Sequence, residues 1–280
     1  MSASTLPEVS RKLRRKAQVA KPTTGLPRPV WGLLGVVFFL GIWELLPTLG
    51  IVQGRYLPPA SEVLVQLAKD FTFTAFWVSV GETMMAWAIG LFWAVLLALV
   101  LGLVIGMSGF LRRFTYSTVE FLRPIPSVAL IPLAVLMFGT KIESSLMLII
   151  YACFWQVFIQ VLYGVADVDN VAMQTARSYG FSWIQRVRDV IFPTVLPYLM
   201  TGIRLGASVA LILAITAELI IGSPGLGHEI QLAQSGGAIA GMYALIVATG
   251  LLGVVINLVM RAIEKKVLSW HPSVRGEVIV

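Results

Sequence analysis

Residues 83–107 read TMMAWAIGLFWAVLLALVLGLVIGM, a stretch that contains no charged side chain. About 20 mostly apolar residues form a helix long enough to cross the roughly 30 Å of hydrocarbon in a bilayer. The stretch therefore predicts a membrane-spanning helix. Four more stretches meet the same criterion, and they lie near residues 30–50, 144–164, 198–221 and 241–262.

The composition of the whole chain also indicates a membrane protein. Hydrophobic residues make up 58% of the 280 residues and charged residues only 12%, with a mean hydropathy of +0.86. Because soluble domains carry about 25% charged residues, this chain has too little polar surface to face water. The net charge of +7 does not indicate a nucleic-acid partner, and none is expected, because the positions of the basic residues point to the membrane.

A sixth, weaker span is predicted near residues 117–138. It carries Glu120 and Arg123, which lie three residues apart and are expected to pair on their own helix. The same segment contains three prolines: Pro124, Pro126 and Pro132. Because a proline removes a backbone donor, the segment must bend and pack against protein rather than lipid. The sequence thus predicts an all-α integral membrane protein with about six transmembrane helices.

The basic residues lie mostly on one side of the predicted membrane domain. Six spans place both termini on the same side, and sixteen Lys and Arg residues fall in the segments expected there. Only three fall in the opposite loops: Arg55, Lys69 and Lys141. Because cytoplasmic loops carry such an excess, both termini are predicted to be cytoplasmic. The first span follows a basic tail, residues 1–29, and is predicted to stay uncleaved because no clear cleavage site follows it.

A short amphipathic helix is predicted between the first two spans. The segment begins Leu57-Pro-Pro-Ala-Ser-Glu-Val, and Ser61 is followed by apolar residues at helical spacing, so Ser61 is expected to cap the helix. It is placed at the outer surface of the membrane, as a plain connecting helix.

Residues 165–192 form the longest predicted cytoplasmic loop, and their sequence is typical of two short helices. Asp169 or Asn170 can cap a first helix, because a side-chain oxygen there accepts a bond from a free backbone N–H. Gly180 can end this helix in a left-handed conformation. Ser182 can cap a second short helix. The loop is therefore predicted to be a compact helix–turn–helix.

The second of these helices carries an apolar stripe, and Pro193 then opens the next long helix. The stripe has helical spacing and consists of Trp183, Ile184, Val187, Val190 and Ile191. A stripe of this kind can pack under the spans or can present a surface to a partner, and the spacing alone allows both.

The loop resembles the EAA loop of ABC-importer permeases, a signature of the form E-A-A-x-x-x-G-x9-I-x-L-P. Here the positions read Gln174-Thr175-Ala176, three residues, Gly180, nine residues and Val190-Ile191-Phe192-Pro193. The Ala, Gly and Pro match in register, whereas Gln, Thr, Val and Phe replace consensus residues. In that family the loop forms a coupling helix that docks into a groove on a separate ATPase subunit. The resemblance implies this role for six residues: Gln174, Thr175, Ala176, Gly180, Phe181 and Pro193.

Further segments resemble the nitrate/sulfonate/taurine/bicarbonate branch of these permeases. The match covers Leu122-Arg-Pro-Ile-Pro-Ser-Val-Ala-Leu-Ile-Pro-Leu-Ala-Val-Leu-Met-Phe-Gly139, the segment that begins at Leu57, and Ala217-Glu218-Leu219 followed by Gly225-Leu226-Gly227. The resemblance implies a type I ABC importer transmembrane domain over residues 30–262, with cytoplasmic tails at 1–29 and 263–280, in a bacterial cytoplasmic (inner) membrane.

The same resemblance implies the partners. They are an ABC ATPase subunit, in two copies, a periplasmic or lipid-anchored solute-binding protein and a second copy of the permease. The solute is expected to be small and anionic, similar to a sulfonate, taurine or nitrate. A vitamin precursor or an aromatic acid is the alternative within the same family.

The chain lacks the motifs of an enzyme. None of its seven lysines follows a glycine, so it contains no G-x-x-x-x-G-K-[ST] phosphate loop, and ATP must be used by the partner subunit. Cys153 is the single cysteine, and His228 and His271 are far apart, which excludes a Cys/His metal cluster. No cofactor is expected. An ion-gradient-driven secondary transporter is the alternative function, although no clear internal repeat supports it.

Charged residues inside a span are costly and often mark function. Arg204 and Glu218 lie 14 residues apart in the fifth span, within about 40° of one helix face and about 21 Å apart along the axis. Both could line a translocation pathway, together with Ser208 and Thr216. Alternatively, Arg204 reaches the membrane interface and Glu218 caps the outer loop, while small polar side chains such as Gln156 join neighbouring helices.

Overall fold

The computed structural model describes residues 28–270, and within this range it contains helices and no β-strand. Most of the predicted basic tail, residues 1–27, and the end of the predicted C-terminal tail, residues 271–280, lie outside the described residues. The all-α prediction is therefore confirmed for the described part of the chain.

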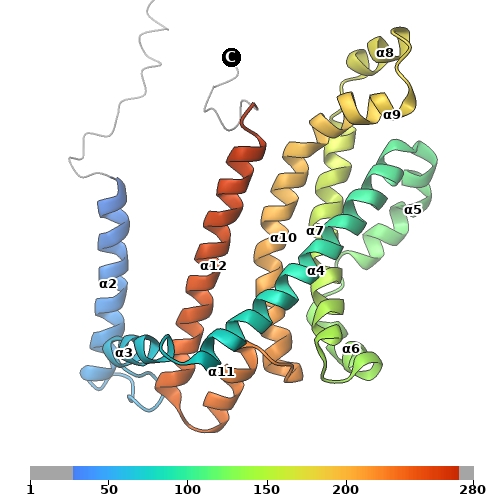
Figure 1. Cartoon of the computed structure of the whole chain (residues 1–280). Helices are drawn as coiled ribbons and strands as arrows, with labels where there is room; N and C mark the ends of the chain where they lie inside the picture. Colours follow the sequence, from blue (N-terminus) through green and yellow to red (C-terminus); the bar gives the residue numbers. More distant parts are fainter. Residues whose placement is uncertain (1–27, 271–280) are drawn as a thin grey trace, which may run out of the picture.

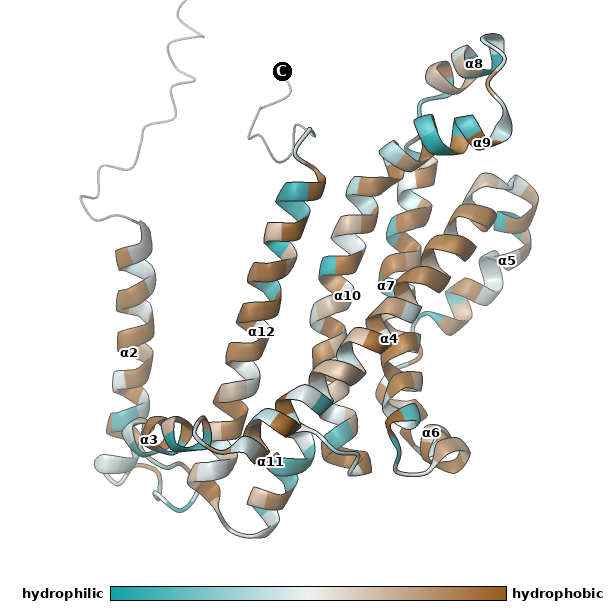
Figure 2. Cartoon of the chain, viewed as in Figure 1, coloured by the Kyte–Doolittle hydropathy of each residue, from teal (hydrophilic) through white to brown (hydrophobic). Residues whose placement is uncertain are grey.

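Five helices are long and apolar enough to cross a membrane (Figures 1 and 2). They are α2 (Arg28–Thr48), α4 (Thr74–Met107), α7 (Ile142–Ala166), α10 (Phe192–Ile221) and α12 (Ile239–Val267). Each corresponds to one of the predicted spans. Four are longer than predicted, because a helix need not end where the most apolar stretch ends, whereas α2 ends at Thr48 rather than at residue 50. The second span, for example, begins at Thr74 rather than at residue 83.

The weak sixth span is broken, as its prolines predict. Helix α5 (Gly109–Leu122) is followed by a 3₁₀ turn, η1 (Ser127–Leu130), and by α6 (Ile131–Phe138). The two halves pass the test for a span only together and are bent by 82°. No residue of α5 is fully buried in this single chain, although Val119 packs against a buried cluster formed by α4, α7 and α10. In α6, Ile131 and Ala134 are buried, so this part of the segment packs against protein as expected.

The expected pair between Glu120 and Arg123 is not formed. The Tyr116 hydroxyl donates to the Glu120 carboxylate at 2.7 Å, and no described acidic group lies within ion-pair distance of Arg123. Arg123 still has helical backbone angles, so the bond between Tyr116 and Glu120, and not the end of the helix, accounts for the missing pair.

Helices α4, α7 and α10 form the core of the bundle. Small residues let α7 and α10 approach closely, as is usual between membrane helices. A Cβ added at Gly164 would lie 2.9 Å from the Val195 Cα atom, and one at Gly202 would lie 3.1 Å from the Val157 Cα atom. Neither glycine could therefore become larger without moving the two helices apart.

Two short helices cover one end of the bundle, α3 (Ala60–Asp70) and α11 (Leu226–Ser235). The amphipathic prediction for α3 is confirmed, because Val63 and Leu67 are buried in a cluster with Leu226. The predicted cap is wrong. The Ser61 hydroxyl donates to Glu44 of α2 at 2.8 Å, and α3 begins after Pro59 without a side-chain cap. The Ser61 hydroxyl, which the sequence pattern assigned to the helix cap, is instead bound by the carboxylate of Glu44, 17 residues away.

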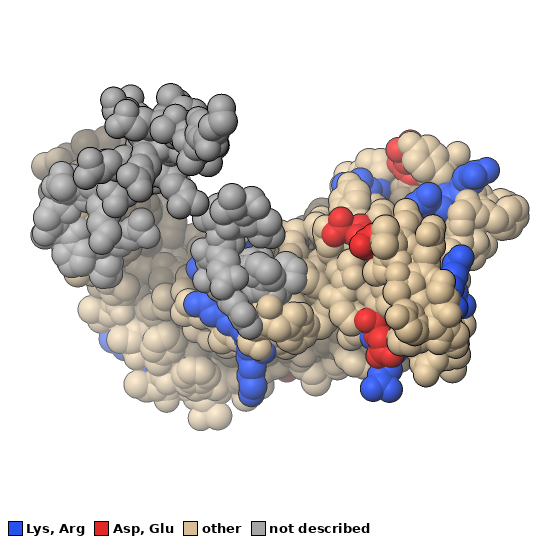
Figure 3. All heavy atoms as spheres, turned by 90° about the horizontal axis from the view of Figure 1, so that it is seen from above, with Lys and Arg blue, Asp and Glu red and all other residues tan. Residues whose placement is uncertain are grey.

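The opposite end carries α8 (Asn170–Ser178), α9 (Trp183–Arg186) and a short π-helix, η2 (Val187–Ile191), that leads into α10. The first residue of α2 and the last residue of α12 lie at this same end (Figure 1). Figure 3 looks onto it and shows Lys and Arg side chains spread over the described elements. The described basic residues near this end are Arg112, Arg113, Arg177, Arg186, Arg188, Arg261, Lys265 and Lys266.

Candidate functional site

Helix α8 begins and ends with the local bonds that its sequence predicts. The Asp169 carboxylate accepts a hydrogen bond from the Val171 N–H at 2.8 Å, so Asp169 is the cap. At the other end Gly180 has a φ of +75°, and the Phe181 N–H donates to the Ala176 carbonyl at 2.9 Å. This is the left-handed helix ending that favours glycine. The chain therefore reverses direction sharply after α8.

Helix α9 follows at once and is held by a reciprocal cap. The Gln185 N–H donates to the Ser182 hydroxyl at 3.3 Å, and the Ser182 N–H donates to the Gln185 side chain at 2.7 Å. Such a capping box satisfies two free backbone donors. The predicted cap at Ser182 is confirmed, and Pro193 lies in the first turn of α10 as expected. We refer to residues 169–186 as the α8–α9 unit.

The apolar stripe that begins in α9 and continues through η2 divides between two environments. Ile191 is buried beneath the unit with Val195, so this part of the stripe packs under the spans. Trp183 is 61% exposed and Ile184 is 70% exposed. Tyr179, which lies on the neighbouring turn, is 79% exposed. Large apolar side chains that gather on an exposed, rigid turn are typical of a surface that binds another protein.

The six residues expected to couple to an ATPase lie on or beside this unit. Gln174, Thr175 and Phe181 are exposed, whereas Ala176 is buried at the turn. The Thr175 hydroxyl donates to the Val171 carbonyl within α8, so it adds no outward polar contact. Gly180 forms the left-handed turn and Pro193 begins α10. The structure brings these residues to one end of the molecule, and their role in coupling stays a prediction.

The opposite end contains a buried carboxylate. Glu218 of α10 is 1% exposed, and its carboxylate accepts from the Thr83 hydroxyl at 2.9 Å and from the Gly227 N–H at 3.0 Å. The Thr83 hydroxyl in turn accepts from the Leu226 N–H at 2.9 Å. These groups, called the Glu218 cluster below, join α4, α10 and the start of α11. This geometry matches the alternative in which Glu218 fastens the outer loop.

The glycines on either side of Leu226 are required by the Glu218 cluster. A side chain at Gly225, whose φ is +146°, would collide with the Glu218 carboxylate. A side chain at Gly227 would collide with the Ile215 carbonyl of α10. The Gly-Leu-Gly motif therefore lets the backbone of α11 approach the carboxylate, as glycine permits wherever another group must come close.

Arg204 is engaged in an ion pair rather than free. Its guanidinium donates to Glu264 of α12 at 3.0 Å, and the two side chains are 39% and 19% exposed. The Ser208 and Thr216 hydroxyls donate to carbonyl groups of their own helix, those of Arg204 and Ile212. No contact brings these residues together with Glu218, and their place in a translocation pathway stays a prediction.

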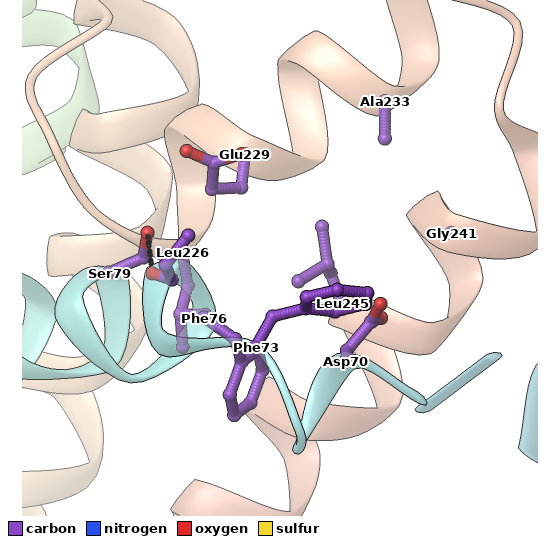
Figure 4. Close-up of a pocket in the computed structure, with 10 residues that line it drawn as sticks. Asp70, Phe73, Phe76, Ser79, Leu226, Glu229, Ala233, Gly241 and Leu245 are labelled. Carbon is purple, nitrogen blue, oxygen red and sulfur yellow. Dashed lines mark hydrogen bonds between the residues drawn. The ribbon is translucent and has the colours of Figure 1, made fainter. Parts of the chain in front are cut away.

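A cavity of about 320 Å³ lies between α3, α4, α11 and α12, beside the Glu218 cluster (Figure 4). Phe73, Phe76 and Leu245 supply much of its wall, and the carboxylates of Asp70 and Glu229 lie at its edge. Its described lining contains no Lys or Arg. Two carboxylates without a cation repel an anion, so this cavity is unsuited to an anionic ligand.

The described residues contain no group of three or more His, Cys, Asp or Glu side chains that could hold a metal ion. Cys153 is buried in α7, and its thiol donates to the Gly206 carbonyl of α10. The prediction that the chain needs no cofactor stays a prediction.

Residues 94–269 match the family described as binding-protein-dependent transport system inner membrane component. The taurine transport system permease protein TauC of Escherichia coli (strain K12) is 31% identical over 249 residues, which cover 87% of this chain and 90% of TauC. A Bacillus subtilis (strain 168) protein named for aliphatic sulfonates transport, SsuC, is 28% identical and covers 98% of both chains. The nitrate import permease protein NrtB of Synechocystis is 23% identical and covers 86% of this chain and 90% of NrtB.

A chain of the MetNI methionine ABC transporter, in an inward facing conformation, has a similar fold. The TM-score is 0.60 at 19% sequence identity, and the match covers 69% of this chain and 96% of that chain. At this identity the likeness concerns the fold alone. It confirms the predicted type I importer architecture for the part of the chain that it covers.

Proposed function

The chain belongs to the binding-protein-dependent transport system inner membrane components, as an ABC permease of the nitrate, sulfonate and taurine branch, and from this membership we propose that it imports a small anionic solute and is driven by a separate ATPase. Sulfonates are the solute class that we propose, because TauC and SsuC are named for taurine and aliphatic sulfonates and cover most of the chain. A vitamin precursor or an aromatic acid has no comparable support.

The α8–α9 unit is the element that we assign to ATPase docking. Its exposed Trp183 and Ile184, which lie within the capping box of Ser182 and Gln185, carry this assignment. A stiff surface transmits a partner's motion better than a mobile loop, because little of the displacement is lost in bending. The end that carries this unit would face the cytoplasm, which agrees with the excess of basic residues there.

The other partners follow from the same proposal. A solute-binding protein would approach the opposite end, where α3 and α11 cover the bundle. Two permease chains and two ATPase subunits would complete the importer. We propose two copies of this one chain.

Reconstitution tests the proposal directly. The chain would be purified with its ATPase and its solute-binding protein, placed in liposomes, and assayed for uptake of labelled taurine and of an aliphatic sulfonate. We expect uptake only when ATP and both partners are present. Uptake by the chain alone, driven by an ion gradient, would instead support a secondary transporter and overturn the proposal.

A surface substitution tests the docking assignment. Trp183→Ala should weaken binding of the ATPase about tenfold or more, because a buried tryptophan at an interface contributes on the order of 2 kcal/mol. Phe110→Ala is the matched control, since Phe110 is 75% exposed at the same end of the molecule but lies on α5. Equal loss of affinity in both variants would count against the α8–α9 unit as the docking element.

A further inference from the structure

A second cavity, of about 400 Å³, lies where the broken span meets α7 and α10. Residues 123–126, which join α5 to η1, and Ser127, the first residue of η1, form one wall, and residues of α7 between Tyr151 and Tyr163 form the other. The Tyr151 hydroxyl donates to the Leu122 carbonyl at 2.6 Å and fixes the break against α7. We refer to this space as the Arg123 cavity.

The Arg123 cavity lies at membrane depth. Tyr151 follows Ile142, the first residue of α7, by nine residues, or about 13 Å along the helix axis. The other end of α7 is farther away, at Ala166. The break that contacts Tyr151 is therefore inside the roughly 30 Å hydrocarbon layer and not at its edge. An arginine at this depth is costly unless it has a partner or faces water, and such residues commonly mark a solute pathway.

Arg123 has no partner among residues 28–270, in contrast to Arg204. Arg204 is neutralised by Glu264, whereas Glu120, the acidic residue nearest to Arg123 in sequence, binds the Tyr116 hydroxyl. Only one of the two intramembrane arginines is therefore available to a ligand.

The other described residues that line the Arg123 cavity likewise lack acidic groups and include polar side chains without hydrogen-bond partners. No Asp or Glu is found among its described lining residues, and six polar side chains there make no hydrogen bond within residues 28–270. For Trp155 the unpartnered atom is the indole Nε1, a group that can only donate. Gln156, Gln160 and Tyr163 follow one face of α7 at helical spacing. The six side chains are Arg123, Ser127, Trp155, Gln156, Gln160 and Tyr163.

This composition selects one class of ligand. All six side chains can donate hydrogen bonds, one carries a positive charge, and a guanidinium binds the paired oxygens of an oxyanion with two parallel bonds. Ala152, Ile159 and Val209 add an apolar part to the wall. A small molecule with an oxyanion head and a short apolar tail satisfies both parts.

We propose that the Arg123 cavity is an intramembrane binding site for the sulfonate group of the transported solute. The inference rests on the proposed function and adds the site at which the solute pauses between the two faces of the membrane. Arg123 binds the sulfonate oxygens, and the amide and hydroxyl donors of α7 replace its lost water. The apolar tail lies against Ile159 and Val209.

Transport by the complete importer in liposomes tests this site. Arg123→Gln should lower ATP-driven sulfonate uptake about tenfold or more, because it removes the charge-assisted hydrogen bonds to the sulfonate oxygens. ATP hydrolysis without solute should stay within about twofold, and Arg123→Lys should restore part of the uptake. Arg113→Gln, an exposed arginine of α5 away from the cavity, should leave uptake unchanged.

A labelling experiment keeps the proposal testable if Arg123→Gln fails to assemble. Gln156→Cys, in a chain whose own cysteine is replaced (Cys153→Ala), would react with a neutral maleimide in the purified importer. Ethanesulfonate should slow this reaction severalfold, whereas a neutral sulfone of the same size should not. Equal reaction rates with both compounds would overturn the proposal.

The outcomes separate the two levels of inference. If the wild-type importer moves no sulfonate, the proposed function fails. If it moves sulfonate and Arg123→Gln does so within about twofold of the wild type, only the intramembrane site is wrong.

Discussion

The two ends of the molecule are stabilised in different ways. The α8–α9 unit is shaped by bonds between residues two to five positions apart, such as those at Asp169, Gly180 and Ser182. The Glu218 cluster combines one bond between residues nine positions apart with two between residues 135 and 143 positions apart in the chain. The first leaves its large side chains exposed, and the second buries a carboxylate almost completely.

This contrast separates residues that hold the fold from residues that are free to bind a partner. The polar atoms of the Glu218 cluster are used to attach α11 to α4 and α10, so a change there should affect the whole bundle. The apolar atoms of Trp183 and Ile184 contact little of this chain, so a change there should affect a partner and leave the fold intact. The three predictions below test this separation, from the largest expected effect to the smallest.

Glu218→Ala should destabilise the whole membrane domain. It leaves the buried Thr83 hydroxyl and the Gly227 N–H without an acceptor, at a cost of about 3 kcal/mol. We expect a clearly lower melting temperature and a loss of monodisperse protein in detergent. Glu229→Ala removes a neighbouring carboxylate that lacks such bonds, and its melting temperature should stay close to that of the wild type. If both variants melt alike, the Glu218 cluster is not an anchor.

Gly180→Val should remove coupling but not the fold. A β-branched residue is strained by on the order of 2 kcal/mol at a φ of +75°, so the turn after α8 would open and displace α9. We expect ATP-driven uptake to fall tenfold or more, while the melting temperature changes little. Gly250→Val is the control, because Gly250 also has open space around it but has no positive φ. Undiminished uptake by Gly180→Val would contradict the role of the unit.

Arg204→Gln should have the smallest effect. Its ion pair with Glu264 is partly exposed, and pairs of this kind contribute about 0–1 kcal/mol. We expect uptake and melting temperature close to the wild-type values, and the same for the double variant Arg204→Gln, Glu264→Gln. A tenfold loss of uptake in the single variant would instead return Arg204 to the solute pathway.

The sequence predicts best where short-range forces decide the structure. The spans, the cap at Asp169, the turn at Gly180 and the cap at Ser182 depend on neighbours within a few residues, and each is confirmed. The errors at Ser61 and at the Glu120–Arg123 pair have one cause, which is a competing partner that local reasoning did not include. For Ser61 this partner is Glu44 of another helix. For Glu120 it is Tyr116, one turn back.

One wall of the Arg123 cavity could be predicted from the sequence, whereas the position of the opposite wall could not. Gln156, Gln160 and Tyr163 recur at helical spacing within an otherwise apolar span, and this polar stripe can be recognised in the sequence alone. Its position in the same cavity as Arg123 depends on an 82° bend between two helices, and the direction of a bend cannot be read from the prolines that cause it. Choosing between the two predicted roles of Glu218 likewise required the position of Thr83, which lies on another helix.

The continuity of α9, η2 and α10 has a mechanical consequence. Together they form one continuous helical segment from Trp183 to Ile221, 39 residues or about 58 Å along its path, which turns between α9 and α10 (Figure 1). This segment is pressed against α7 near its middle, where Gly164 and Gly202 allow backbone contact. If α10 tilted by about 5° about that contact, its Ile221 end, about 29 Å away, would move by roughly 2.5 Å, and the end that carries α9 would move in the opposite direction. A displacement of the α8–α9 unit in one direction would therefore move the opposite end of α10 in the other direction.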